Sequence, residues 1–321
     1  MKLEITSECR SNHIGRKNGH ARWSRSISPA LTIASGEIVT FDTIDSSNGR
    51  ICRTSDATVI SSLDIDDANP VFGPVYVKDA QPGDTLKVEV LALETADWGW
   101  TATIPGFGLL ADEFPEPSLY IWDIDKAQGC AFFKNNIRIP LRPFLGCMGL
   151  APATYEELST VPPTIAGGNL DCRDLTVGSI VYLPVQATGA LFSCGDGHAA
   201  QGHGEVCGTA IETPTKATLR FEVCKHMAWI TSPQYEIPAS ARSASSVSQL
   251  GQYATTGIGL SLYEATRVAV QNAIQWMVAT KGLSRTEAYM LASVAGDLQI
   301  IEAVNMPNFV VSMSIPLGIF G

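Results

Sequence analysis

The sequence predicts an α+β fold that is predominantly β, and three patterns indicate it. Short apolar segments of strand-like composition, such as residues 180–185, recur along the chain. Turns rich in Gly, Pro, Ser and Thr separate them roughly every 10–20 residues. A sustained helical period appears only after residue 258. We therefore expect a β-sandwich or barrel-like N-terminal and central part and an α+β C-terminal part with two helices.

The length and composition of the chain are those of a well-packed globular protein. Its 321 residues are 45% apolar and only 17% charged, which excludes a disordered chain. We expect a β-rich catalytic part over residues 1–225 and an α+β part over residues 226–321 packed on it. One continuous domain that includes both parts is the alternative.

Charge and cysteine content restrict the partners and the compartment. The net charge of −10 argues against a nucleic-acid partner, and no polybasic patch indicates a membrane surface. No run of eighteen apolar residues occurs, and the segment MKLEITSECRSNH lacks the apolar core of a signal peptide. The eight cysteines are scattered without a CxxC pair, which is typical of thiols in a reducing compartment. We therefore expect a cytoplasmic protein.

Two segments of the N-terminal half alternate apolar and polar residues on both sides of a turn. Residues 31–50 surround a Ser-Gly turn and end in the acidic tip 45–49, and residues 73–94 surround a Pro-Gly-Asp turn. Both patterns predict β-hairpins. A further strand pair is expected from residues 118–125 and 130–141.

Three loops carry aromatic or acidic residues. The loop of residues 104–117 is rich in Gly, Pro and aromatics, which either wall a pocket or attach the loop to the core. Gly167-Gly168 lets the backbone pass close to another group, so Asp171 behind it is a stronger site candidate than an average Asp. The acidic segment 64–69 lacks the glycine and glutamate of an EF-hand loop, and we interpret it as a solvated turn.

The C-terminal part contains the two predicted helices. Residues 258–281 have a helical apolar stripe. Ser284 and Glu287 fit a capping box that opens a second helix, which we expect to continue to residue 304. Residues 308–315 indicate a final strand.

Chemistry is concentrated in residues 189–213, GALFSCGDGHAAQGHGEVCGTAIET. This stretch places the carboxyl groups of Asp196 and Glu205 and the imidazoles of His198 and His203 on a glycine-dense backbone. Glycines allow tight turns and positive φ angles, so these groups are expected to come together at a turn. Such a group can bind a divalent cation or move protons during hydrolysis.

Two interpretations of this stretch involve no metal. A dinucleotide fingerprint is excluded, because Gly195-x-Gly197 is followed by no helix that could receive a pyrophosphate. A metal-free cysteine amidase needs a thiolate beside a base, and both Cys194 and Cys207 lie near His198 in the sequence. Both cysteines also suit a buried strand, and the cysteine amidase stays an alternative.

The third interpretation is a metal site. Asp196 and His198, together with Asp45 and Asp171 from other strands, offer mixed oxygen and nitrogen ligation that suits zinc or a similar ion. A bound cation lowers the pKa of its water and polarises an amide carbonyl. A glutamate of the same stretch can then serve as general base and later protonate the leaving nitrogen. The structural alternative is that these acidic turns bind calcium or no ion.

Several of these segments together resemble the acetamidase/formamidase family. The resemblance rests on the central stretch and on shorter motifs across residues 20–215, GPVYVKDAQPGDTLKVEV, PGFGLLADEFPEP, PFLGCMGLAPA and GGNLDCRDL. It implies a hydrolase that splits formamide, acetamide or related short linear amides into a carboxylate and ammonia. It also implies a β-rich fold with an α+β C-terminal part, a divalent metal and a homodimer or higher homo-oligomer.

The resemblance also assigns roles to residues at matching positions. We expect Asp45, Asp196 and His198 to hold the metal, zinc first and calcium as a second or structural ion. We expect Glu205 to take the proton from water and Asp171 to orient water or the amide NH₂ group. Glu212 is the other glutamate that suits the role of base.

The substrate contacts are expected at His20, Gly195, Gly197 and His203. His20 also suits a role as a further metal ligand, and backbone N–H groups of the glycines suit an oxyanion. His203 stands where many relatives have Asp, and Arg50 stands where Gln is usual. These departures allow a larger amide, a carbamate or a cyclic amide. The alternative from another class is a non-catalytic small-solute-binding protein with a structural cation.

Overall fold

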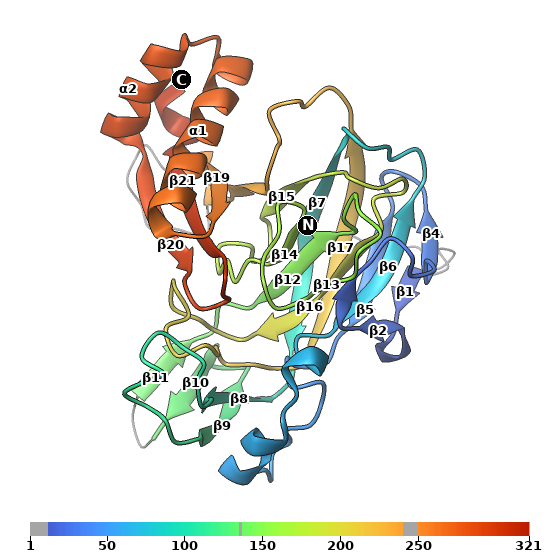
Figure 1. Cartoon of the computed structure of the whole chain (residues 1–321), viewed down its shortest axis with the longest axis vertical. Helices are drawn as coiled ribbons and strands as arrows, with labels where there is room; N and C mark the ends of the chain where they lie inside the picture. Colours follow the sequence, from blue (N-terminus) through green and yellow to red (C-terminus); the bar gives the residue numbers. More distant parts are fainter. Residues whose placement is uncertain (1–11, 135–136, 240–249, 321) are drawn as a thin grey trace.

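The structure, a computed structural model, describes residues 12–134, 137–239 and 250–320, and most of its strands form two large sheets (Figure 1). The larger sheet has nine strands in the order β1-β5-β17-β7-β15-β18-β19-β21-β20. Their bounds are β1 (Asn12–Ile14), β5 (Ile38–Asp42), β17 (Thr215–Cys224), β7 (Thr85–Thr95), β15 (Ile180–Pro184), β18 (Gln234–Ile237), β19 (Gln252–Gly259), β21 (Phe309–Pro316) and β20 (Asp297–Glu302). The strand predicted at residues 180–185 is therefore confirmed.

The second large sheet packs against the first and completes a β-sandwich. Its members are β14 (Gly167–Asn169), β12 (Phe144–Leu150), β16 (Phe192–His198), β6 (Val71–Val77), β2 (Gly19–His20) and, beside β6, β4 (Leu31–Ile33). Phe192 of β16 contacts Phe41 of β5 and Phe221 of β17 at ring-centroid distances of 6.0 Å and 4.9 Å. Because these rings come from both sheets, the two inner faces share one core, as in a sandwich.

Two smaller sheets complete the β structure. An antiparallel meander consists of β8 (Trp98–Thr103), β9 (Ser118–Asp125), β10 (Cys130–Phe133) and β11 (Ile137–Pro140), and a short pair consists of β3 (Arg22–Trp23) and β13 (Leu158–Ser159). The predicted pairing of residues 118–125 with the strand that begins at residue 130 is confirmed, but the predicted strand of residues 130–141 is two strands, β10 and β11, which pair with each other. The short 3-10 helices are η1 (Arg16–Asn18), η2 (Ala57–Ser62), η3 (Ile65–Asp67) and η6 (Leu317–Phe320).

Both hairpins predicted in the N-terminal half are wrong, because in each the consecutive strands enter different sheets. β4 pairs in parallel with β6, whereas β5 pairs with β1 and β17. β6 and β7 likewise belong to the six-stranded and the nine-stranded sheet. A strand with one buried face shows the same alternation in either sheet of a sandwich, so alternation alone does not tell which strand it pairs with.

Two helices cover the part of the nine-stranded sheet that the C-terminal strands form. They lie at the opposite end of the molecule from the β8–β11 meander (Figure 1). Helix α1 (Leu262–Lys281) begins at its N-cap Ser261, so the predicted start at residue 258 is wrong because Ile258 still belongs to β19. Trp276 of α1 stacks on Tyr253 of β19 with ring centroids 4.2 Å apart. This contact attaches the helix to the sheet.

The second helix, α2 (Arg285–Ala295), has the predicted capping box of Ser284 and Glu287. The predicted end at residue 304 is wrong, because residues 297–302 form β20 and pair with β21. A Cβ atom on Gly296 would lie 2.7 Å from the Ala292 carbonyl oxygen, so this position favours a glycine where the chain passes from helix to strand.

The nine-stranded sheet includes strands from both ends of the chain. β15 pairs with β18, which joins the N-terminal strands to the C-terminal strands in one sheet. The predominantly β α+β fold with two C-terminal helices is confirmed, and the division at residue 225 stays a prediction. Among the described residues, no helix has the length and apolar character needed to cross a bilayer.

Candidate active site

A cavity of about 340 Å³ contains most of the acidic residues singled out in the sequence. Four of its lining residues are buried acids, namely Asp171, Asp196, Glu205 and Glu212. The remaining lining residues come mainly from the segments 46–69 and 104–107. The loop of residues 104–117 therefore contributes a pocket wall, one of the two roles expected for it.

Strand β16 presents Asp196 and His198 on the same face, because side chains two residues apart in a strand point the same way. The glycines on either side of Asp196 allow close packing on the opposite face of the strand. A Cβ atom would lie 2.2 Å from the Pro70 carbonyl oxygen at Gly195 and 2.1 Å from Thr215 Oγ1 at Gly197. Neither glycine lines the cavity, and their predicted contact with substrate stays a prediction.

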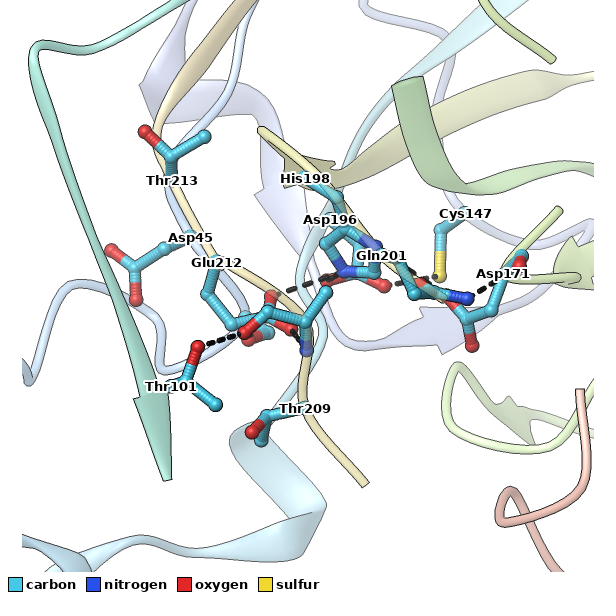
Figure 2. A network of polar contacts seen from close by, with 12 residues as sticks. Asp45, Thr101, Cys147, Asp171, Asp196, His198, Gln201, Thr209, Glu212 and Thr213 are labelled. Atoms are coloured by element: carbon cyan, nitrogen blue, oxygen red, sulfur yellow. Dashed lines mark hydrogen bonds and ion pairs between the residues drawn. The ribbon is translucent and has the colours of Figure 1, made fainter. Parts of the chain in front are cut away.

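His198 lies at the centre of the acidic residues (Figure 2). Its Nε2 is 3.2 Å from both Asp196 Oδ1 and Glu212 Oε2. Its Nδ1 is 2.9 Å from Gln201 Oε1, and Gln201 Nε2 donates to the Asp171 carbonyl oxygen at 2.8 Å. Since the Gln201 amide oxygen can only accept, Nδ1 carries a proton and Nε2 faces the carboxylates. Burial alone lowers the pKa of His198, but the charges of Glu212 and Asp196 outweigh it and raise the pKa well above the usual value.

Glu212 is held in place by two hydrogen bonds, one of them from the turn that contains Ser46. Its Oε2 accepts a hydrogen bond from Ser46 Oγ at 2.7 Å, and its Oε1 accepts one from the Ala210 N–H at 2.8 Å. Its backbone bridges to both Trp100 and His198. Burial favours the neutral acid, but the positive His198 outweighs it and lowers the pKa of Glu212. Glu212 is therefore the ionised partner of His198.

Asp171 and Asp196 bring two carboxylates side by side. A Cβ atom on Gly146 would lie 2.5 Å from Asp171 Oδ1 and 2.4 Å from Asp196 Oδ2. Only glycine therefore fits at this position of β12. Asp171 Oδ2 accepts a hydrogen bond from Asn305 Nδ2, whereas Oδ1 accepts none from the described residues. Burial first and the charge of Asp196 second raise the pKa of Asp171 to about 7.

Glu205 completes the acidic group from the loop that follows β16. It is 6% exposed and lines the cavity. Burial first and the charge of Asp171 second raise its pKa well above the usual value. Glu205, Asp171 and Asp196 have φ angles of 45°, 46° and 58°, in the left-handed region that side chains other than Gly, Asn and Asp rarely adopt. Such backbone strain concentrates at functional sites.

These side chains form two groups with metal-binding geometry that share one imidazole. The first is Asp171, Asp196 and His198, and the second is His198, Glu205 and Glu212; within each group the ligand atoms lie within 4.8 Å of one another. Four buried carboxyl groups around a single imidazole would carry excess negative charge if all were ionised, and the raised pKa values of Asp171 and Glu205 reflect this. A divalent cation would balance that charge in place of protons. The donor set and the unused Asp171 Oδ1 therefore fit a cation.

Asp45, the third predicted ligand, lies outside both groups. Its Oδ1 accepts hydrogen bonds from Ser47 N–H at 3.0 Å, from the Ser47 hydroxyl and from Trp100 Nε1 at 3.0 Å. The carboxylate thus stabilises the turn that carries Ser46, which in turn donates to Glu212. Asp45 supports the acidic group through this turn.

The two predicted histidine contacts also lie outside the cavity lining. His20 Nδ1 is 2.8 Å from the Arg22 carbonyl oxygen, and His20 Nε2 is 3.1 Å from Ser193 Oγ. His203 Nε2 lies 4.0 Å from Asp174 Oδ2, in a second cavity that shares Glu205 with the first. Their roles toward substrate stay predictions.

Cys147 and Cys194 near the site are buried thiols, whereas Cys207 is half-buried. Burial raises the pKa of Cys147 and Cys194 well above the usual value, which keeps both protonated. Cys147 Sγ donates to Asn169 Oδ1 at 3.0 Å and lies 4.0 Å from Asp196 Oδ2. Cys207 Sγ donates to the Thr209 carbonyl oxygen at 3.3 Å.

Three amide side chains at the site were not predicted, and Glu212 was predicted only as a base. Gln201 lies three residues after His198, and an amide at that spacing is a local signal for an orienting partner. Asn169 follows the Gly167-Gly168 pair that was noted. Asn305 reaches Asp171 across 134 residues of chain, and no local pattern indicates such a contact.

The chain is similar to known amidases over nearly its whole length. The sequence model of the acetamidase/formamidase family matches residues 6–158 and 153–321. A formamidase of Methylophilus methylotrophus is 25% identical, with 94% of this chain and 89% of that protein covered. The crystal structure of an acetamidase from Bacillus halodurans has a TM-score of 0.87 at 30% identity, covering 96% of this chain and 98% of its own. A gamma lactamase from Delftia acidovorans has a TM-score of 0.67 at 25% identity, covering 94% and 89%.

Proposed function

Because the chain belongs to the acetamidase/formamidase family and is an amidase of linear amides, we propose that a divalent cation in its acidic cavity supports this hydrolysis. The products are a carboxylate and ammonia. The observation that carries the proposal is the charge of the site, where four buried carboxyl groups surround one imidazole. Buried charge without a counter-ion costs several kcal/mol per group, roughly, and a bound cation removes that cost.

The residues that would hold the cation are Asp171, Asp196 and His198, with Glu212 as the further carboxylate. We assign this last position to Glu212 in place of Asp45, because Asp45 lies outside both groups of possible ligands and its Oδ1 accepts from Ser47 and Trp100. An imidazole combined with carboxylates suits zinc better than calcium, which prefers oxygen ligands alone. When bound, the cation would polarise the amide carbonyl and lower the pKa of water.

Glu205 moves the proton in this proposal. Its carboxyl group lines the cavity, and burial raises its pKa well above that of an exposed glutamate. Its ionised form takes a proton from the attacking water, and its neutral form gives that proton to the leaving nitrogen. Asp171, oriented by Asn305, positions the water or the amide NH₂ group.

Asn169 is placed to donate to the substrate carbonyl oxygen. It is buried and lines the cavity. The Cys147 thiol donates to its Oδ1 at 3.0 Å, which fixes the oxygen of the amide group and leaves the NH₂ end to donate. A donor aimed at a developing oxyanion typically contributes about 10²–10³ in kcat.

Elemental analysis combined with an ammonia-release assay tests the proposal. Asp196→Ala and His198→Ala are each expected to lose the bound metal and at least 10³-fold in kcat while keeping the folded circular dichroism spectrum. His13→Ala is the control, because His13 is half-exposed and pairs with Asp42 at 2.8 Å. The proposal is wrong if both site variants fold and keep metal and full activity.

The cysteine amidase remains a second candidate mechanism with its own signature. Inactivation by iodoacetamide together with indifference to chelators would favour it, whereas the raised pKa of Cys147 and Cys194 argues against a thiolate. A non-catalytic binding protein would bind amides saturably without releasing ammonia. The cytoplasmic location and the homo-oligomeric state stay predictions.

A further inference from the structure

We infer that the amide substrate carries a neutral, apolar acyl group larger than acetyl, of the size of a branched aliphatic chain or a phenyl ring. The inference rests on the proposed function and concerns the apolar lining of the same cavity. Three properties of that lining support it: its volume, its side chains and its charge.

The cavity is larger than a short amide requires. Acetamide has four non-hydrogen atoms and, at about 30 Å³ per atom as in liquid water, takes roughly 120 Å³. The cavity of about 340 Å³ leaves most of its volume unfilled by that molecule. Phenylacetamide, with ten such atoms, takes roughly 300 Å³ on the same measure. The cavity therefore has room for an acyl group with about eight carbon atoms.

Apolar side chains from two separate segments supply much of the lining. Residues 60–65 and the loop 104–107 are separated by about 40 residues of sequence, yet both line the cavity. The apolar lining residues are Ile60, Leu63, Ile65, Ala68, Trp100, Ile104, Pro105, Phe107 and Val161. Burying one methylene group against such a surface improves binding about fourfold.

The charge of the lining disfavours an anionic acyl group. Among the described lining residues the cationic side chain is Arg50, and its Nη2 already pairs with Asp67 Oδ2 at 2.8 Å. Asp64 also lines the cavity, and its carboxylate accepts a hydrogen bond from the Asp66 N–H at 3.0 Å. A carboxylate on the acyl group of the substrate would meet Asp64 without a free cationic side chain to balance it.

The ammonia-release assay across a series of primary amides tests the inference on the metal-loaded protein. From acetamide through butyramide to hexanamide, kcat/KM is expected to rise about fourfold per methylene group, and phenylacetamide is expected to exceed acetamide at least 30-fold. Succinamate, which is anionic, is expected to fall below butyramide. If acetamide or formamide is the best substrate, the inference is wrong and the proposed function stands. If no amide releases ammonia, the proposed function is wrong as well.

A pair of leucine variants adds a second readout. Leu63→Ala removes an apolar lining side chain and is expected to lower the ratio of kcat/KM for phenylacetamide to that for acetamide at least fivefold. Leu110→Ala is the matched control, since Leu110 is 48% exposed and does not line the cavity. Equal ratios in the two variants would overturn the assignment of this wall to the acyl group.

Discussion

Asp171 and Asp174 are three residues apart and both are 1% exposed, yet their surroundings differ in charge. Asp174 Oδ1 accepts a hydrogen bond from Arg142 Nη2 at 2.6 Å, and His203 lies 4.0 Å from its other oxygen. Asp171 instead lies beside the carboxylate of Asp196. A buried carboxylate with its own cation is part of a structural ion pair, whereas a buried carboxylate among others needs a cation from outside the chain. The balance of charge around a buried carboxylate, more than its burial, therefore distinguishes a site residue from a structural one.

The same difference explains where His203 lies. Gly195-Asp196-Gly197-His198 and Gly202-His203-Gly204-Glu205 look alike as sequences, and both histidines were predicted at the site. His198 lies among unbalanced carboxylates and His203 lies beside the Asp174 ion pair. Spacing along the chain does not distinguish the two, because their partners come from distant segments.

Among variants that keep the metal, a replacement of Glu205 is expected to lower kcat the most. Glu205→Gln removes the proton-transfer group and keeps the shape, so kcat is expected to fall about 10³-fold with the metal retained. In the parent enzyme, activity should decline as the pH falls through the raised pKa values of Glu205 and Asp171, and the part of this acidic limb that belongs to Glu205 should vanish in the variant. Steady-state kinetics from pH 5 to pH 9 measure both effects.

Exposed Glu113 supplies the control for that measurement. Glu113→Gln removes the same charge from the surface and is expected to leave kcat and its pH profile unchanged. If Glu205→Gln keeps more than a third of the parent kcat, Glu205 is not the proton-transfer group.

Removing each aspartate charge should change stability with opposite sign, which tests the comparison directly. In metal-free protein at pH 8, Asp171→Asn is expected to raise the free energy of unfolding by about 1–3 kcal/mol. The folded pKa of Asp171, about 7, exceeds the unfolded value, so its ionised form destabilises the fold as the pH rises through 7. Asp174→Asn leaves Arg142 without its anion and should lower the free energy of unfolding by about 2 kcal/mol, reduced by the 28% exposure of Arg142.

Urea unfolding with and without chelator measures both changes. Asp174→Asn should still bind metal and hydrolyse amide, while Asp171→Asn should do neither at the parental level. A loss of stability of similar size in both variants would contradict the comparison, because it would make Asp171 a structural residue like Asp174.

Local patterns predicted much of this architecture and less of its pairing. The apolar run at residues 180–185, the capping box at Ser284 and the acidic stretch around Asp196 all depend on neighbours within a few residues, and the structure has all three. The predicted hairpins are wrong because β4 and β6 belong to one sheet of the sandwich and β5 and β7 to the other. The second helix was overextended because β20 forms only through its pairing with β21.

The site shows the same division between local features, which were predicted, and contacts between distant segments, which were not. Asp196 and His198 belong to one strand and were predicted together. The role of Glu212 depends on its bridge to His198 and on Ser46 from a distant turn. The positive φ angles at Asp171, Asp196 and Glu205 are set by the surrounding packing, and the neighbouring glycines gave no sign that the acids themselves adopt them.

Asn305 provides the smallest expected effect and tests whether the C-terminal part belongs to the site. Glu302 accepts the N–H groups of Val304 and Asn305, which folds the turn that aims the Asn305 amide at Asp171 Oδ2. This hydrogen bond favours the ionised carboxylate, so Asn305→Ala should raise the pKa of Asp171 further. We expect about a tenfold fall in kcat, a smaller change in KM and a shift of the acidic limb to higher pH. Asn308→Ala, which loses a similar bond of 2.9 Å to the Pro163 carbonyl oxygen, should leave the limb in place. If both variants lose the same activity with unshifted profiles, Asn305 only stabilises the turn and the unbalanced charge at Asp171 is set by the N-terminal part alone.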